Sequence, residues 1–396
     1  MMILIRGIIL VTALSLTTAF GKTAHVRTPS TAPAPEPFCA PAVIPFTETV
    51  HGAFTLPLPC RVGIEAVVSS FESRFAIVTF SGQSIIGVDT VSAEEYKGGT
   101  RSVLGSEDEH NLVLLSAAEV AVLDRPENRV SVEYTTASPR ADFQTKYFQG
   151  KIAGSDRLLI IAEVSPSVGE EGVVDATLHS LVYDDVRVRK TLSRIVIEHP
   201  LNEQPPVFFS KDVVIYRNKR KDASEPWKAL DNTLSPISHP LCALLDREFR
   251  QFLIYGLVMS DRHRHAVVSA TNADTKMPAI NYISWKSSKV SSIAMPAGMF
   301  LGQKNLMMSP SGKWVFFTAT IDNEGKRAMN HVLVYLDPDL PSGFLPPFVV
   351  AEGKNEDRAA WITEPEGLVV FGKGQVSLWD LSKFVPKKPK TKPKKR

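Results

Sequence analysis

The sequence is poor in cysteine, and after its first residues it has no long apolar run. Only 3 of the 396 residues are cysteine, which excludes a scaffold held together by many disulfides. After residue 21 no apolar stretch approaches the roughly 20 residues that a helix needs to cross a bilayer. Lys and Arg number 45 against 42 Asp and Glu, so the total charge of +3 does not indicate a polyanion-binding chain.

Several catalytic signatures are also missing from the sequence. There is no Gly-x-Ser-x-Gly nucleophile elbow, no glycine-rich phosphate loop and no Cys-x-x-Cys pair. We therefore expect no added hydrolase or nucleotide-binding domain. The hydrophobic content of 44% and the charged content of 22% are those of a globular chain, which is long enough to bury a large core.

Residues 1–21 have the pattern of a signal peptide. A single early cation, Arg6, is followed by an uncharged run from Gly7 to Phe20, with small residues at Ala19 and Gly21. We expect cleavage after Gly21 and an extracytoplasmic protein, periplasmic or secreted. The alternative is an uncleaved anchor, because the apolar run can also be counted from Ile3.

Residues 22–61 are expected to form an extended linker. Six prolines between Thr28 and Pro45 fix φ and remove backbone donors, which favours a polyproline-type tether. Cys39 and Cys60 lie near its far end, and in an oxidising compartment they are expected to form a disulfide. The alternative is that both are free thiols. Cys242 lies in an apolar run and is expected to be a small buried residue.

Residues 62–384 predict an all-β domain. The apolar segments are short, rich in β-branched and aromatic residues and bounded by turn residues, as in Phe75–Phe80, Val213–Tyr216 and Trp314–Thr318. Each is long enough for a strand and too short for a stable helix. Short helical turns are expected only within 116–122 and 242–252.

The strands recur in degenerate repeats. Ala266–Thr271 aligns with Val315–Thr320, and each is followed by a polar turn and another strand. Strands that end in Asp recur from Asp89 to Asp380, a span that six intervals of about 48 residues would fill. This spacing predicts a β-propeller with seven blades, and it leaves six or eight open because the intervals are irregular.

Two segments carry a resemblance to a known family. Ser309–Phe317 resembles the Ser-Pro-Asp-Gly-Lys turn and strand that open blades in TolB-like and WD40-like β-propellers, with Ser311 in place of the usual Asp. Leu378–Leu381 is similar to the strand end that names the WD repeats. Pro310 and Gly312 would make the tight turn, after which alternate residues such as Trp314 enter the core between blades.

The resemblance implies a toroid with a central channel and two loop-bearing faces, and it implies no particular reaction. Such a ring needs a strand that joins its two ends. We expect this strand from Ala42–Val50 or from Ala66–Val68, beside the blade that ends at Leu381.

The candidate active or metal-binding residues are few. His263 and His265 would point to one face of a strand, but no third ligand has a regular spacing, so a polar turn is the expected reading. The acidic run Glu107–Glu109 is expected on a surface loop, and Asp184 is expected to cap a turn. We therefore expect no catalytic residue, no metal site and no cofactor.

The last residues, 385–396, are expected to be a disordered basic tail, because residues 387–396 have no acidic residue and no apolar residue except two prolines. We expect the tail either to bind an anionic surface in a salt-dependent way or to act only as a solubilising end. The cations that would bind a polyanion are Lys387, Lys388, Lys390, Lys392, Lys394, Lys395 and Arg396.

Together these features predict an exported, monomeric, non-enzymatic β-propeller that binds a protein or an envelope polymer and does not recognise nucleic acid sequence. The alternative is a propeller-type hydrolase or lyase that acts on carbohydrate or lactone through carboxylates at the channel mouth. A third reading is a cell-surface structural protein held by its tail.

Overall fold

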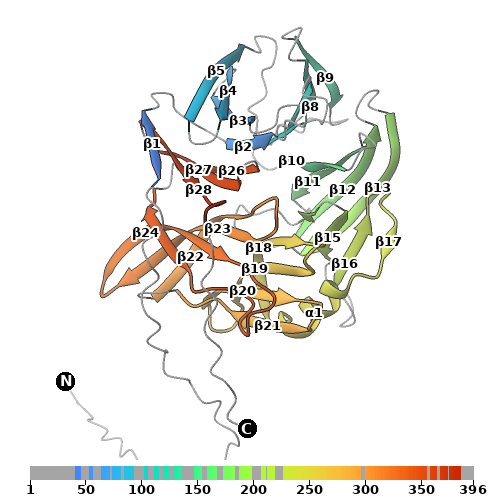
Figure 1. Ribbon diagram of the computed structural model, residues 1–396. Coiled ribbons are helices and arrows are strands. Elements are labelled where there is room, and N and C mark those ends of the chain that lie inside the picture. The colour runs from blue at the N-terminus through green and yellow to red at the C-terminus, as the bar shows by residue number, and fades with distance from the viewer. Residues whose placement is uncertain are drawn as a thin grey trace, which may run out of the picture. The chain divides into compact units, whose positions relative to one another are not determined.

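The computed structural model describes most of the strands and, from residue 207 onward, most of their side chains (Figure 1). The chain divides into two compact units, Met1–Glu36 and Pro37–Arg396, and every described residue belongs to the second. The described residues are 41–45, 53–56, 64–71, 74–81, 84–92, 102–105, 111–115, 119–124, 129–135, 147–153, 158–166, 173–182, 187–198, 207–210, 212–218, 226–295, 299–354, 357–363, 366–372 and 374–384.

The strands form seven antiparallel sheets of four strands each, which confirms the all-β propeller class and its seven blades. We number the sheets 1 to 7 in chain order. Sheet 1 consists of β2 (Ala53–Leu56), β3 (Ile64–Phe71), β4 (Arg74–Ser81) and β5 (Ser84–Ser92). Sheet 2 consists of β6 (Ser102–Gly105), β7 (Asn111–Leu115), β8 (Glu119–Asp124) and β9 (Arg129–Thr135). Sheet 3 consists of β10 (Tyr147–Ala153), β11 (Leu158–Pro166), β12 (Val173–Val182) and β13 (Arg187–Glu198).

The remaining four sheets follow in the same way, with one helix between sheets 4 and 5. Sheet 4 consists of β14 (Val207–Phe209), β15 (Val213–Arg217), β16 (Trp227–Asp231) and β17 (Pro236–Ile237). Sheet 5 consists of β18 (Phe252–Ser260), β19 (His265–Asn272), β20 (Pro278–Ser284) and β21 (Lys289–Ser292). Sheet 6 consists of β22 (Met299–Met308), β23 (Trp314–Asn323), β24 (Lys326–Tyr335) and β25 (Phe348–Glu352). Sheet 7 consists of β26 (Arg358–Thr363), β27 (Glu366–Gly372), β28 (Gln375–Asp380) and β1 (Ala42–Pro45).

The sheets close into a ring through the first strand of each. Strand β2 contacts β6, β6 contacts β10, β10 contacts β14, β14 contacts β18 and β18 contacts β22. Sheets 6 and 7 share a buried cluster that includes Trp314, Phe316, Trp361 and Trp379. Strand β26 then contacts β2 and β3, so that the last sheet meets the first.

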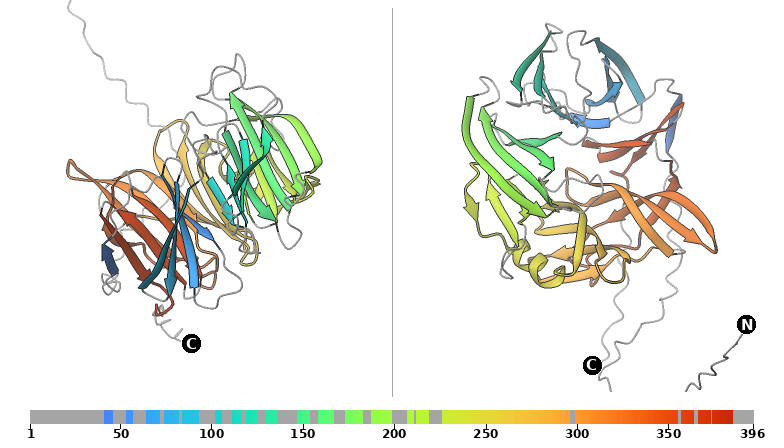
Figure 2. Two further views of the ribbon diagram at one scale, coloured as in Figure 1. Left: turned by 90° about the horizontal axis from the view of Figure 1, so that it is seen from above. Right: turned by 180° about the vertical axis from the view of Figure 1, so that it is seen from behind.

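Strand β1 supplies the closing strand of the ring. It pairs antiparallel with β28, with Ala42 opposite Leu378 and Pro45 opposite Gln375. Figures 1 and 2 show this blue strand beside the red strands of sheet 7. This confirms the first of the two expected closing segments, whereas the second lies inside β3. A proline is tolerated in β1 because β1 is the edge strand of sheet 7.

The prediction of a linker over residues 22–61 is therefore wrong at its C-terminal end. Both β1 and β2 lie inside that range and belong to the ring. The proline content was a poor guide here, because edge strands and strand ends accept proline as readily as a tether does. The expected signal peptide, Cys39, Cys60 and the tail from residue 385 onward lie outside the described residues.

Alternate side chains of one strand enter two different cores. In β15, Val213 and Ile215 pack with sheet 5, while Val214 packs with sheet 3. In β23, Phe316 packs with sheet 7, while Phe317 packs with sheet 5. Both faces of such strands are buried, which explains why the sequence shows continuous apolar runs in place of apolar–polar alternation.

Helix α1 (Pro240–Glu248) connects sheet 4 to sheet 5. The ring of His239 caps it, because Nδ1 accepts a hydrogen bond from the Leu241 amide at 3.3 Å, and proline occupies the first turn. One face of the helix is buried in the core between sheets 4 and 5 through Leu241, Cys242, Leu244 and Leu245. Within the described part of the chain, no helix has the length and hydropathy to cross a membrane.

Candidate functional site

The turns of sheets 5 to 7 lie at two opposite ends of their strands. Each sheet is an antiparallel meander, so the turns after its first and third strands share one end. We call this end the tail face, because β28, the third strand of sheet 7, ends there. The other end, which we call the connection face, carries the turn after the second strand and the connection that enters the sheet.

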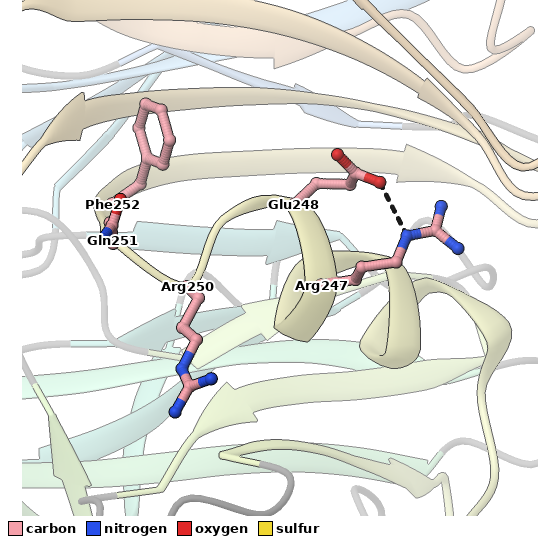
Figure 3. Close-up of a pocket in the computed structure, with 5 residues that line it drawn as sticks. All are labelled: Arg247, Glu248, Arg250, Gln251 and Phe252. Carbon is pink, nitrogen blue, oxygen red and sulfur yellow. Dashed lines mark hydrogen bonds and ion pairs between the residues drawn. The ribbon is translucent and has the colours of Figure 1, made fainter. Parts of the chain in front are cut away.

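A pocket of about 550 Å³ lies on the connection face, where α1 ends and β18 begins. Its described lining residues are Arg247, Glu248, Arg250, Gln251 and Phe252. Figure 3 shows that these side chains fan out from the turn, with Phe252 and Glu248 on one side and Arg250 extending to the other. The pocket is therefore lined by two guanidinium groups, an amide and the partly buried ring of Phe252, whose side chains diverge from the turn.

The backbone below this pocket is held from sheet 4. The buried Arg217, at the end of β15, donates from Nη1 to the Phe252 carbonyl at 2.8 Å and from Nη2 to the Arg250 carbonyl at 3.4 Å. Phe249 follows α1 as its C-terminal cap, and its amide donates to the Leu245 carbonyl. Its ring contacts that of Phe252 edge-on, with 5.4 Å between the ring centroids. These contacts fix the turn, so its outward side chains start from a rigid base.

The charges of the pocket suit binding rather than proton transfer. Arg247 Nε donates to Glu248 Oε1 at 2.6 Å, so the one described carboxylate of the pocket is already paired. Both side chains are exposed, which makes this a weak surface ion pair that an incoming anion can rearrange. An arginine keeps its proton in proteins and offers a planar fork to carboxylate or phosphate oxygens.

The arrangement that most resembles a catalytic triad is buried between sheets 6 and 7. His331 Nε2 donates to Asp357 Oδ2 at 2.9 Å, and the Thr318 hydroxyl lies 3.3 Å from His331 Nδ1. Since a carboxylate only accepts, Nε2 carries the proton and Nδ1 accepts from Thr318. Burial lowers the pKa of His331, and the hydrogen bond to Asp357 opposes that shift.

This set is better suited to holding sheets together than to catalysis. Thr318 is 1% exposed and does not line the neighbouring cavity of about 100 Å³, so no substrate reaches its hydroxyl. Asp357 lies in the connection between sheets 6 and 7 and also accepts the Lys354 amide at 2.8 Å. Gly353 permits this close approach, because a Cβ there would lie 2.9 Å from the His331 ring.

Replacing Asp357 with alanine is therefore expected to lower the free energy of unfolding by about 1–3 kcal/mol, because the His331 and Lys354 N–H groups lose their acceptor in a buried place. Chemical denaturation measures the change. Asp339→Ala is the control, since Asp339 is exposed and its removal should cost less than about 0.5 kcal/mol. Equal stability of the two variants would contradict the assignment.

Of the two histidines considered as metal ligands, His263 lies in the turn after β18 and His265 is the buried first residue of β19, and both have backbone partners. His263 Nε2 lies 2.9 Å from the Ser311 carbonyl, and His265 Nε2 lies 2.8 Å from the Gly312 carbonyl. Their rings stack at 5.6 Å, so they do share one side of the strand. Among the described residues, no group of three or more His, Cys, Asp or Glu side chains is placed to hold a metal ion.

A second polar network joins sheets 4 and 5 on the tail face. Asp261 accepts from the Ser210 hydroxyl at 2.7 Å, and its other oxygen lies 3.3 Å from His239 Nε2. Because the hydroxyl and the imidazole both bind the carboxylate, the imidazole is not placed to activate the hydroxyl. The network instead fixes the start of α1 against the turn after β18.

The remaining sequence candidates lie outside the described residues: Glu107–Glu109, Asp184, the Cys39–Cys60 pair and the seven tail cations. Sequence reasoning missed the pocket at Arg247 and Arg250 and the supporting Arg217. The only local signal was the predicted helical turn at 242–252, which placed two arginines near a helix end. That signal did not show that a residue of another sheet would hold this turn.

Comparisons with known proteins agree with the fold. No protein-family model matches the sequence, and no curated protein matches it. An oligogalacturonate lyase from Vibrio parahaemolyticus is similar in structure, with a TM-score of 0.53 and 10% sequence identity over 86% of this chain and 97% of the lyase chain. An uncharacterized protein from Listeria monocytogenes gives a TM-score of 0.46 and 12% identity over 84% of this chain and 96% of that chain. The first similarity is one of fold alone.

Proposed function

We propose that this protein is an exported, non-enzymatic β-propeller that binds an anionic envelope polymer through the pocket between α1 and β18. The observation that carries the proposal is the lining of that pocket, where two guanidinium groups stand beside an amide and an aromatic ring. Arginine forks pair with carboxylates, and an aromatic ring packs against the apolar face of a sugar or side chain.

The polar networks elsewhere support a binding role. The described histidines with the closest carboxylate partners, His331 and His239, hold neighbouring segments together; the partner of His331, Asp357, is buried, and the partner of His239, Asp261, is partly buried. A ring whose interior polar groups brace its sheets provides a rigid frame for recognition at its ends.

Removal of both pocket arginines provides the test. In the full-length protein, Arg247→Gln with Arg250→Gln is expected to weaken binding of a carboxylated oligosaccharide such as oligogalacturonate by at least about tenfold, because charged hydrogen bonds contribute about 1.5–3 kcal/mol each. Isothermal titration calorimetry measures the affinity, and the neutral oligogalactoside serves as the uncharged ligand.

Lys276→Gln with Lys326→Gln is the matched control, because it removes the same charge from two exposed positions outside the pocket, one in the turn between β19 and β20 and one at the start of β24. The control should bind like the wild type. If the arginine variant also binds like the wild type, or if the neutral sugar binds equally well, the pocket is not a carboxylate site.

A propeller-type lyase is the second candidate, and its support is the fold shared with the oligogalacturonate lyase. The same titration separates the two functions, because a lyase leaves a new carbon–carbon double bond whose ultraviolet absorbance rises with time. Binding without this absorbance supports the module. A rise in absorbance with time supports the lyase.

Export and anchoring complete the proposal. The apolar start of the chain supports secretion, and the seven tail cations support salt-dependent contact with an anionic surface. The mass of the exported protein reports cleavage after Gly21 directly. The same spectrum under non-reducing conditions reports whether Cys39 and Cys60 are joined.

A further inference from the structure

Exposed cations gather on the tail face of sheets 5 and 6. Arg262 and Arg264 lie in the turn between β18 and β19, Lys286 in the turn between β20 and β21, and Lys313 in the turn between β22 and β23. All four side chains are exposed. We call these four residues the basic patch, and we infer that this face docks on an anionic phospholipid surface.

Backbone contacts hold the turns of the basic patch side by side. The Trp285 amide binds the Arg264 carbonyl at 3.1 Å, which places Lys286 next to Arg264. The rings of His263 and His265 bind the Ser311 and Gly312 carbonyls, which places Lys313 next to the same turn. The four cations therefore share one surface, although they come from two sheets.

The backbone of this surface is held in unusual conformations. Gly312 has a φ of +72°, and a Cβ there would lie 2.5 Å from the Ser260 hydroxyl, so only glycine allows the two turns to meet. Arg264 has a φ of +55°, a region in which asparagine or glycine is usual. The side chain of Arg264 is exposed, so its burial does not compensate the energetic cost of the left-handed backbone conformation.

Most acidic groups of the tail face form hydrogen bonds or ion pairs with neighbouring groups. Asp261 binds Ser210 and His239, and Asp337 accepts the amide of Asp339 at 3.0 Å. Asp380 binds Ser382 and Lys383, and hydrogen bonds to both hold its pKa below the usual value despite partial burial. A hydrogen-bonded carboxylate keeps its negative charge, but Asp261 is the one acidic residue in the three turns that carry the basic patch, so these turns hold four cations and one anion.

The start of the basic tail is fixed beside this patch. The ring of Phe384 packs against Trp314 at 4.9 Å, Phe348 at 5.3 Å and Tyr335 at 5.8 Å. Trp314 directly follows Lys313. The seven cations of residues 385–396 thus continue from a point next to the basic patch.

The chain before β1 leaves from the same face. Because Ala42 pairs with Leu378, the start of β1 lies at the end of β28. The four cations come from turns at the same end of two neighbouring sheets, so a planar surface that touches this end can meet all of them together. A linear polymer would follow one line across this end, so the arrangement favours a lipid surface.

The contact is electrostatic and peripheral. Among the described residues, the exposed large apolar side chains are Val43, Ile237, Met277 and Val349, and none lies in a turn of the basic patch. Binding therefore depends on cations near the headgroups, each of which changes the partition coefficient by about fivefold at low salt.

The experiment compares two double variants of the full-length protein. Arg264→Asn with Lys313→Gln removes two cations from the tail face of sheets 5 and 6, and Lys276→Gln with Lys326→Gln removes two from the connection face of the same sheets. Asparagine suits the positive φ at residue 264. Co-sedimentation with phosphatidylcholine vesicles, with and without phosphatidylglycerol, measures the partition coefficient.

The tail-face variant is expected to bind anionic vesicles about 25-fold more weakly than the wild type, and the control variant about equally well. Equal loss in both variants, or equal binding to neutral vesicles, would overturn the proposal. Competition by soluble oligogalacturonate at low concentration would also overturn it, because the face would then be a polymer site.

Two further arms separate this inference from the proposed function. The variant without Arg247 and Arg250 is expected to keep its vesicle binding, since those residues line a pocket on the connection face. Removal of residues 385–396 from the wild type is expected to weaken vesicle binding. When the same residues are removed from both double variants, the tail-face variant should still bind measurably more weakly than the control variant. If the truncated pair binds alike, the turns contribute nothing and the inference fails.

Discussion

Replacing Trp314 with alanine is expected to lower the free energy of unfolding by about 3–5 kcal/mol, the range for large aromatic residues in a packed core. Trp314 is 2% exposed. It is the first residue of β23 in sheet 6, and its side chain packs in the core between sheets 6 and 7. Its ring meets Tyr335 edge-on at 5.0 Å and Phe384 at 4.9 Å, so alanine would leave a cavity that the rigid strands cannot close.

Urea denaturation measures this change, and Trp314→Phe is the matched variant, because it keeps an aromatic ring and should lose much less. The tail also reports the effect. In Trp314→Ala the ring of Phe384 loses its contact with Trp314 and is held less firmly. Limited proteolysis near residue 385 should therefore become faster in this variant. A loss of less than about 1 kcal/mol in the alanine variant would show that sheets 6 and 7 are not joined by this cluster.

The core at Trp314 was largely predictable from the sequence. The Ser309–Gly312 turn forms as expected, with the Gly312 amide bound to the Ser309 carbonyl at 2.8 Å and Trp314 directed into the core. Ser311 supports this turn, because its hydroxyl accepts the Lys313 amide at 3.1 Å. Apolar runs and local turn chemistry were enough to predict the strands, while the seven sheets were predicted from the spacing of strands that end in Asp, which left six or eight open.

Contacts between distant residues were less accessible. The pairing of β1 with β28 followed from the need to close a ring, but only the structure gives the register of the two strands. Arg217 binds two carbonyls of the next sheet, and Asp357 binds His331 across a sheet connection. Such bonds join residues far apart in the chain through side-chain directions that periodicity does not encode.

The basic patch illustrates the same limit. Its four cations lie in three turns that are scattered along the sequence, and the composition of the chain is close to neutral. The hydrogen bond between Trp285 and Arg264 and those of His263 and His265 to the neighbouring turn bring them together. The pair of histidines first considered for metal binding is therefore informative, because it joins the two sheets that carry the patch.

His265 gives the second large expected effect, a loss of stability in acid. Burial is the main reason that its pKa falls from 6.5 to about 4, and the neighbouring His263 adds to the shift, while the hydrogen bond to Gly312 opposes it. The side chain is only 1% exposed. Between pH 6.5 and about 4 the unfolded chain binds a proton that the folded chain excludes.

The free energy of unfolding should therefore be unaffected by this group above pH 6.5 and should fall by about 1.4 kcal/mol per pH unit across the window, to a total of about 3 kcal/mol near pH 4. His265→Gln is the comparison, because its amide can still donate to the Gly312 carbonyl and does not titrate. Denaturation curves of both proteins from pH 7 to about 4 give the difference, in which the titrations of all other groups cancel. Parallel curves would mean that His265 takes up its proton in the folded ring, and the contact between the turns of sheets 5 and 6 would then not depend on a neutral imidazole.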